Sequence, residues 1–228
     1  MSQNPTTQED EAQSSLVDTC SSSVVSGLQS GTLQFSEFEP VYPDNDEPST
    51  AEQIKAAYPE IANVTGWAEK IGAVAASLRI ADPAWLANVM FFESGLNPAA
   101  TNASFGCTGL IQFCPNSGAK EVGKTTDQLR VMGAVEQMDY VQLYLNKYRG
   151  RLSTSADLYM AIFFPIAVGQ GPNYNIYNWY VANKGADSAQ RYLTANLGIK
   201  TAGDYQAFAD RRARLPTALR SSSSVASL

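Results

Sequence analysis

The chain has 228 residues, the composition of a soluble globular protein, a formal net charge of −6 and no histidine. The lack of histidine excludes serine or cysteine catalysis through an imidazole base, and it excludes metal sites with imidazole ligands. Any chemistry must therefore use carboxylates, hydroxyls, amides, lysine, arginine or cysteine. No apolar run approaches the roughly 20 residues that span a bilayer, so no transmembrane segment is expected.

The charge is unevenly distributed. Residues 1–54 contain ten of the acidic residues and no lysine or arginine, whereas the remainder holds 12 acids and all 16 bases. This mildly positive body is not basic enough to indicate nucleic acid as a partner. It suits an anionic polymer such as a cell wall, although an ordinary surface charge explains it equally well.

The first part of the chain reads as an acidic arm. Residues 1–48 are rich in Ser, Thr, Gln, Glu and Pro, and they show no sustained hydrophobic period. The start is polar, without a basic segment or an apolar stretch, so no signal peptide is expected. We predict an extended arm over 1–48, one domain over 49–220 and a low-complexity tail over 221–228.

The domain reads as mainly helical. Ser49 with Glu52 predicts a capping box and a helix to about Tyr58. Apolar residues with a 3.6-residue period predict a second helix over 67–78. Asp82 followed by Pro83 predicts the start of a third helix, which Gly95 ends.

The second half of the domain adds further helices. Residues 99–116 lack a period and predict loops or a small β-hairpin. The longest helix is expected to begin at Thr126 or Asp127 and to end at Gly150. Ser155 is expected to cap an apolar helix that Pro165 kinks or ends. Residues 170–183 read as aromatic and irregular, and two last helices are predicted over 187–197 and 201–214.

Glu93 is the candidate catalytic residue. It lies three, four and seven residues after Met90, Val89 and Leu86, on the core-facing stripe of its helix. It also lies in the last turn, at the negative end of the helix dipole. Apolar surroundings and the dipole both raise the pKa of a carboxyl group, as a general acid near neutral pH requires. The alternative is a glutamate that reaches past the helix end to solvent or caps a loop amide.

Three short segments around Glu93 carry a resemblance: 93–98 (Glu-Ser-Gly-Leu-Asn-Pro), 103–106 (Ala-Ser-Phe-Gly) and 109–113 (Gly-Leu-Ile-Gln-Phe). In order and spacing they resemble the active-site signature of soluble-type lytic transglycosylases, relatives of goose-type lysozymes. The likeness is strong over residues 93–113 and extends over about 60–215 as a general helical pattern. It implies a lysozyme-like helical fold that cuts peptidoglycan.

The resemblance also implies roles. Glu93 would be the single acid/base at the bond between N-acetylmuramic acid and N-acetylglucosamine, and the product would be a 1,6-anhydro sugar without any cofactor or metal. Ser94 would brace the helix end. Further residues would bind substrate: Ser104, Gly109, Gln112, Phe113 and Tyr159. Gln112 taken alone reads as a surface amide.

One departure from the family concerns a tyrosine whose hydroxyl contacts the catalytic glutamate in a Tyr-Asn-Ala-Gly motif. Here Phe163 stands in that place. Tyr159 lies one turn earlier on the same face, where it would either supply the hydroxyl or belong to the core. If the reaction were hydrolytic, a second carboxylate would be needed. The candidates are Asp127, Asp139 and Asp157.

The three cysteines do not form a metal or redox motif. Cys107 and Cys114 flank the Gly-Leu-Ile-Gln segment, and Cys20 lies in the arm. A disulfide between the first two would stiffen that loop in an oxidising compartment, and two buried thiols are the alternative.

The expected location follows from the missing signal and from the arm. We expect a phage virion protein, of the tail or of the ejected contents, made in the host cytoplasm and acting in the periplasm or cell wall. The arm over 1–48 would then dock on other virion proteins. The alternatives are a free endolysin and a weakly active or inactive structural component of a phage tail or capsid.

Overall fold

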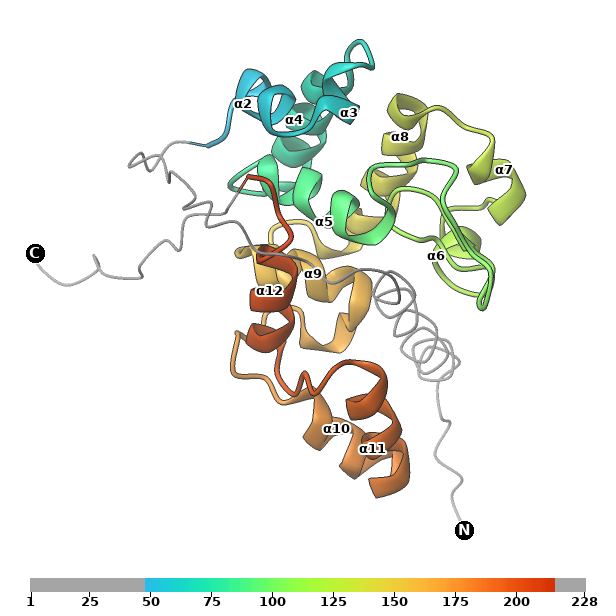
Figure 1. Ribbon diagram of the computed structural model, residues 1–228, viewed down its shortest axis with the longest axis vertical. Coiled ribbons are helices and arrows are strands. Elements are labelled where there is room, and N and C mark those ends of the chain that lie inside the picture. Colours follow the sequence, from blue (N-terminus) through green and yellow to red (C-terminus); the bar gives the residue numbers. More distant parts are fainter. Residues whose placement is uncertain (1–47, 216–228) are drawn as a thin grey trace, which may run out of the picture.

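The computed structural model describes residues 48–215, which form a mainly helical body with one small hairpin (Figure 1). The predicted arm except Pro48, the tail over 221–228 and Cys20 lie outside the described residues. The helices are α2 (Ala51–Ala57), α3 (Pro59–Ala62), α4 (Trp67–Leu78), α5 (Ala84–Ser94), α6 (Gly118–Glu121), α7 (Thr126–Arg130), α8 (Ala134–Leu145), α9 (Ser155–Phe163), α10 (Ile176–Lys184), α11 (Ala186–Ala195) and α12 (Ala202–Asp210). Two 3-10 turns follow α8 and α9, η1 (Asn146–Tyr148) and η2 (Pro165–Ala167).

Two predicted caps are wrong by one residue. Thr50 caps α2 by accepting from the Gln53 amide, and Gln53 Oε1 accepts from the Thr50 amide in return. Ser49 instead donates through its amide and its hydroxyl to the carboxylate of Asp82. Thr154, rather than Ser155, caps α9 in the same reciprocal way. Both helices are present as predicted, because Ser and Thr are both favoured N-cap residues. The backbone conformation decides which of two neighbouring hydroxyl residues takes the N-cap position.

Helix α5 occupies the centre of the body, packed against α4, α9 and α12 (Figure 1). At its start Pro83 takes the N-cap position that was expected for Asp82, and Asp82 Oδ1 accepts from the Ala84 amide at 2.9 Å. Its end is the predicted one, because Gly95 adopts the left-handed conformation at φ 62° that closes the last turn. Between these ends the helix is almost wholly buried over residues 84–90. It therefore needs no amphipathic pattern. Glu93 lies in its last turn, directly after the buried part of the helix.

The predicted long helix is wrong as one element, since α7 and α8 are separate. In a continuous helix the Leu129 carbonyl would accept from the Gly133 amide. It accepts instead from the Met132 amide at 3.1 Å and from Gln137 Nε2 at 2.9 Å. Gly133 is extended at φ −69° and ψ 160°. The buried amide of Gln137 thus replaces a helical hydrogen bond and ends α7 early.

The aromatic stretch over 170–183 is partly helical, which corrects the irregular reading. Asn175 accepts from the Asn178 amide and so caps α10. Helix α10 packs on α11 to form a helical hairpin at the lower end of the molecule (Figure 1). Its aromatic residues hid the helix from sequence because they pack on rings of other elements, as Tyr180 stacks on Tyr192 of α11 with ring centroids 4.5 Å apart.

The predicted β-hairpin is present as β1 (Thr101–Asn102) and β2 (Cys107–Thr108), which pair antiparallel. A disulfide joins Cys107 to Cys114, so the first of the two alternatives for these cysteines holds. Both cysteines are buried. The bridge closes a short ring around the Gly109–Gln112 loop. Within residues 48–215, each helix falls short of the length and apolarity that crossing a bilayer would take.

Candidate active site around Glu93

Glu93 lies in the last turn of α5, with its side chain half-buried. Burial withdraws its carboxyl group from water and raises its pKa from 4.5 to about 8, against an opposing hydrogen bond from Tyr205 that lowers it. The group therefore retains its proton at neutral pH and still has an accessible edge. This is the protonation state that a general acid needs.

Tyr205 is the site residue that sequence reasoning missed. It lies on α12, which packs against both α5 and α9, and its side chain hydrogen-bonds with Glu93. Its ring stacks on Phe163 with centroids 4.1 Å apart and an interplanar angle of 18°. Phe163 is the residue that stands in place of the expected tyrosine. The phenylalanine thus supplies a stacking surface, and the hydroxyl comes from a helix more than 100 residues after Glu93.

Tyr159 was expected either to supply a hydroxyl to Glu93 and bind substrate or to belong to the core. The structure corrects the first of these roles. It is 2 % exposed, and its hydroxyl is buried without a hydrogen-bond partner among residues 48–215. Burial raises its pKa, and electrostatic interactions with the acidic groups of Asp210, Tyr58 and Glu93 raise it further. Its ring lies edge-on to Phe92, with centroids 6.0 Å apart. Tyr159 is therefore a core residue behind Glu93, rather than a substrate contact.

Ser94 braces the helix end, as expected. Its hydroxyl lies 2.9 Å from the Met90 carbonyl and 3.1 Å from the Leu110 carbonyl. The second contact ties the Gly109–Gln112 loop to the residue that follows Glu93. The structure therefore brings together the two segments that the motif pairs.

Gly109 and Gln112 both hold unusual backbone conformations in this loop. Gly109 has φ +84°, and a Cβ there would lie 2.5 Å from Gln137 Oε1, so only glycine fits. Gln112 has φ 54°, is 6 % exposed and donates from Nε2 to the Gly109 carbonyl at 3.0 Å. One amide hydrogen of Gln112 thus shapes its own loop. Its buried position corrects the view of it as a surface amide.

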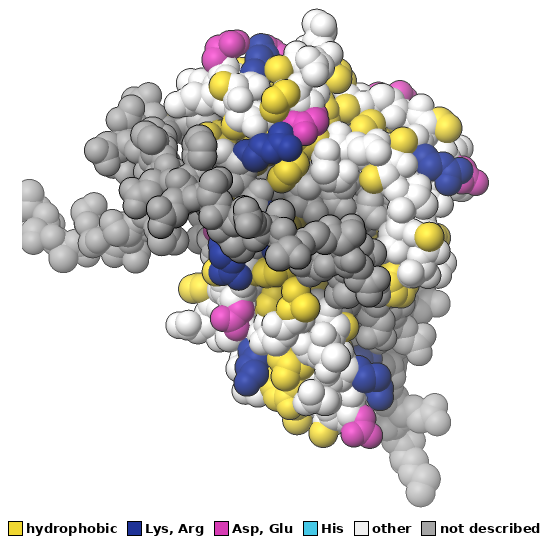
Figure 2. All heavy atoms as spheres, viewed as in Figure 1, with side chains coloured by type: hydrophobic (Ala, Val, Ile, Leu, Met, Phe, Trp, Pro, Cys, Tyr) yellow, Lys and Arg dark blue, Asp and Glu magenta, His cyan; other side chains and the backbone are white. Residues whose placement is uncertain are grey.

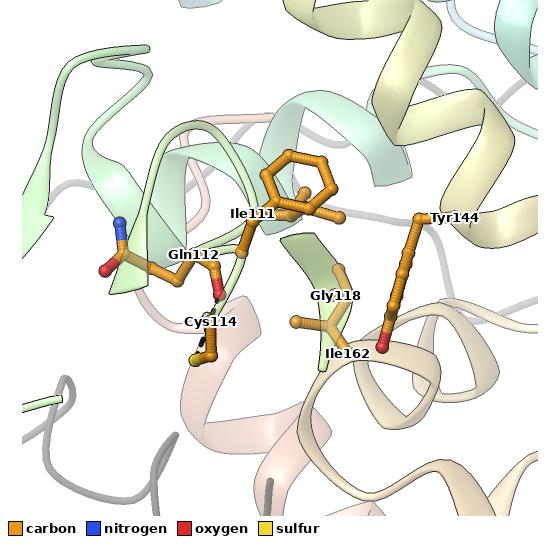
Figure 3. A pocket seen from close by; sticks show the side chains of 7 residues that line it. Ile111, Gln112, Cys114, Gly118, Tyr144 and Ile162 are labelled. Carbon is orange, nitrogen blue, oxygen red and sulfur yellow. Dashed lines mark hydrogen bonds between the residues drawn. The ribbon is translucent and has the colours of Figure 1, made fainter. Parts of the chain in front are cut away.

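Phe113 and Ser104 occupy opposite environments. Phe113 is 1 % exposed and packs edge-on against Tyr144, with centroids 6.2 Å apart, so it belongs to the core and not to a substrate surface. It lines a small pocket with Ile111 and Ile162, and the amide of Gln112 points away from Tyr144 (Figure 3). Ser104 is exposed in the turn between β1 and β2, where its amide donates to Asn102 Oδ1 at 3.0 Å.

The three carboxylates proposed for a hydrolytic reaction are engaged elsewhere. Asp127 pairs with Arg130 at 2.6 Å, and Asp139 pairs with Lys70. Asp157 accepts from the amide of the α9 cap, Thr154, at 3.1 Å and from the Gly169 amide at 2.8 Å. Asp210, which sequence reasoning also missed, has a pKa raised to about 6 by burial and partly offset by a hydrogen bond from Gln206.

The surface charge is mixed. On the face drawn in Figure 2, basic and acidic side chains lie next to one another. Ion pairs of the body include Lys55–Glu69 at 2.6 Å and Arg214–Glu60 at 2.8 Å. Across residues 48–215 no group of three or more Cys, Asp or Glu side chains is arranged to hold a metal ion.

In comparisons with known proteins, no protein-family model, curated protein or solved structure matches this chain.

Proposed function

We propose that this protein is a lytic transglycosylase of lysozyme-like fold that cuts the glycan strand of peptidoglycan between N-acetylmuramic acid and N-acetylglucosamine. One observation carries the proposal: the carboxyl group of Glu93 has a pKa of about 8 and lies beside the loop that the motif pairs with it. A carboxyl group that is withdrawn from water at a helix end and holds its proton at neutral pH suits proton donation to a glycosidic oxygen.

The proposed reaction uses Glu93 twice. The protonated carboxyl group donates to the oxygen of the scissile bond, and the acetamido group of the substrate stabilises C1. The resulting carboxylate then takes the proton of the C6 hydroxyl, whose oxygen closes the 1,6-anhydro ring. Tyr205 donates its hydrogen bond to Glu93. That bond stabilises the carboxylate between the two proton transfers, because a bond to the charged form lowers the pKa.

Replacing the acid tests this assignment. In Glu93→Gln the amide retains the shape of the side chain but cannot donate the proton, so cleavage of purified cell wall should fall by roughly 10²–10⁴. Glu136→Gln, an exposed glutamate on α8, is the matched control and should cleave like the wild type. Wild-type turnover by Glu93→Gln refutes the role. Failure of the wild type to cut any wall favours the alternative of an inactive structural component.

The products test the reaction class. Three candidate second carboxylates, Asp127, Asp139 and Asp157, have partners in Arg130, Lys70 and the Gly169 amide, respectively. The proposed reaction needs no second carboxylate, because the C6 hydroxyl of the substrate takes the place of water. Mass spectrometry of digested peptidoglycan should therefore find 1,6-anhydro termini. Hydrated termini alone would replace the transglycosylase assignment with that of a lysozyme.

The proposal extends to location. Peptidoglycan is the partner of the body, and other virion proteins are the partners of residues 1–48, with action in the periplasm or cell wall. The support is the division of charge, since all 16 basic residues follow residue 54. A chain that begins at Pro48 should still cleave purified wall and should fail to enter particles. Loss of cleavage on this truncation would place the arm within the enzyme domain.

A further inference from the structure

One buried amide joins the segments around the candidate site. Gln137 lies on α8 with a fully buried side chain. Its Oε1 accepts from the Leu110 amide at 2.6 Å, and its Nε2 donates to the Pro98 carbonyl at 3.0 Å and to the Leu129 carbonyl at 2.9 Å. Both amide hydrogens and the carbonyl oxygen are therefore used, each on a different backbone segment.

Two of these segments belong to the candidate site. Pro98 lies in the chain that leaves α5 directly after Glu93, and Leu110 lies within the Gly109–Gln112 loop. Leu110 is held through both of its backbone groups, its amide by Gln137 and its carbonyl by the Ser94 hydroxyl at 3.1 Å. A continuous path of hydrogen bonds thus runs from the residue beside Glu93 through the loop to α8.

The third segment, around Leu129, loses helical structure because of its contact with Gln137. The Leu129 carbonyl accepts from Gln137 instead of closing another turn of helix, and α7 ends at Arg130. Gly109 packs so closely on the amide that a Cβ would lie 2.5 Å from Oε1. The Gly109–Gln112 loop, the end of α7 and the glycine at 109 are all fitted to the Gln137 side chain. A residue that only filled space in the core would not need these three adjustments.

We propose that Gln137 is a positioning residue that holds the Gly109–Gln112 loop at a set distance from Glu93. It acts through Leu110 and Pro98 and does not touch the glycan. The consequence for cleavage rests on the proposed function, whereas the hold on the loop does not. A loop displaced by about 1 Å from the acid would slow the reaction by up to a hundredfold without removing the acid itself.

The test uses the full chain with Gln137→Met, which preserves the volume of the side chain and removes all three hydrogen bonds. Gln142→Met is the matched control, because Gln142 lies on the same helix and donates to Ser77 Oγ at 2.9 Å, away from the loop. Hydrogen exchange at the Leu110 amide should become roughly tenfold faster or more in Gln137→Met and stay unchanged in Gln142→Met. Unchanged exchange in Gln137→Met overturns the proposal.

Cleavage by the folded protein supplies the second measurement. Gln137→Met should lower kcat/KM on soluble glycan by roughly tenfold to a hundredfold. The activity that remains should still be lost when Glu93→Gln is added to the same protein. Lowered stability with unchanged kcat/KM means a structural role only and overturns the positioning role. If wild-type protein cuts no glycan, the proposed function fails, and the exchange result still decides whether Gln137 holds the loop.

A second variant covers the case in which Gln137→Met does not fold. Gln137→Glu retains an acceptor for the Leu110 amide and loses at least one donor. Leu110 exchange should then stay close to that of the wild type, and kcat/KM should fall less than for loss of all three bonds. Fast Leu110 exchange in folded Gln137→Glu contradicts the assignment of this bond.

Discussion

The two sides of the candidate site differ in how far they lie from Glu93 along the chain. The loop side, residues 94–113, is local and is held by Ser94, the Leu110 peptide and a disulfide. The α12 side consists of Tyr205 and the ring of Phe163 on which it stacks. The loop side is built from backbone hydrogen bonds, whereas the α12 side is built from packed aromatic rings. The loop side therefore sets the backbone shape beside Glu93. The α12 side supplies the Tyr205 hydrogen bond, which opposes the rise in the pKa of Glu93 that burial causes.

The largest expected effect concerns the group between these two sides. Folding raises the pKa of Glu93 from 4.5 to about 8, so the folded state binds this proton more tightly than the unfolded state does. The stabilising contribution is complete below pH 4.5 and is lost as the pH rises to about 8. Relative to Glu93→Gln, the wild type should lose up to roughly 4 kcal/mol over that interval, after allowance for the part of the side chain that faces solvent.

Urea unfolding at several pH values measures this difference. The curve for Glu136→Gln, the exposed control on α8, should run parallel to that of the wild type. A parallel curve for Glu93→Gln as well would mean that its carboxyl group titrates normally.

Gly109→Ala challenges the loop side. The alanine would be held at φ +84° with its Cβ 2.5 Å from Gln137 Oε1, so the free energy of unfolding should fall by roughly 2–4 kcal/mol. Gly123→Ala is the matched control, because Gly123 has φ +67° with no atom within 4 Å of the added Cβ. Its cost should be only the conformational part, roughly 1–2 kcal/mol. Equal losses in the two variants would show that the close approach to Gln137 does not matter.

Removal of the Cys107–Cys114 disulfide is a second test of the loop side. Joint replacement of Cys107 and Cys114 by alanine should lower stability by about 2–3 kcal/mol, because the short ring no longer restricts the unfolded chain. A Cys20→Ser background confines the comparison to this pair. Cleavage should fall as well, since the ring surrounds Gly109 and Gln112. Reductant should lower the stability of the Cys20→Ser protein by a similar amount and leave the double variant, which has no cysteine, unchanged. No response of the Cys20→Ser protein to reductant would contradict this contribution of the bridge.

Tyr205→Phe challenges the α12 side. The ring and its stacking on Phe163 remain, but Glu93 loses a hydrogen bond that stabilises its carboxylate. Turnover should fall by roughly tenfold or more, as expected for a bond to a charged group worth about 1.5–3 kcal/mol. The pKa of Glu93 should rise further.

Tyr159→Phe is the control for Tyr205→Phe and has the smallest expected effect. The Tyr159 hydroxyl is buried without a partner among the described residues, so its removal should leave turnover unchanged and stability equal or slightly higher. If Tyr159→Phe slows cleavage more than Tyr205→Phe does, the assignment of the two hydroxyls is reversed.

The difference between the two sides also explains what the sequence could predict. Local rules of capping and periodicity predict where helices end, as at Gly95. The spacing of the motif predicts that the segment of Glu93 lies beside the Gly109–Gln112 loop. Tyr205 could not be found in this way, because its contact depends on how α12 packs against α5. The division of α7 from α8 depends likewise on where the buried amide of Gln137 finds a carbonyl. In both cases tertiary contacts override a local pattern.

The central claim is that Glu93 carries a proton at neutral pH. Titration of its side-chain carboxyl carbon by ¹³C NMR in the full chain tests this most directly, with Glu93→Gln to assign the signal. We expect a pKa of about 8, raised by burial. A midpoint close to 4.5, the ordinary value, would contradict it.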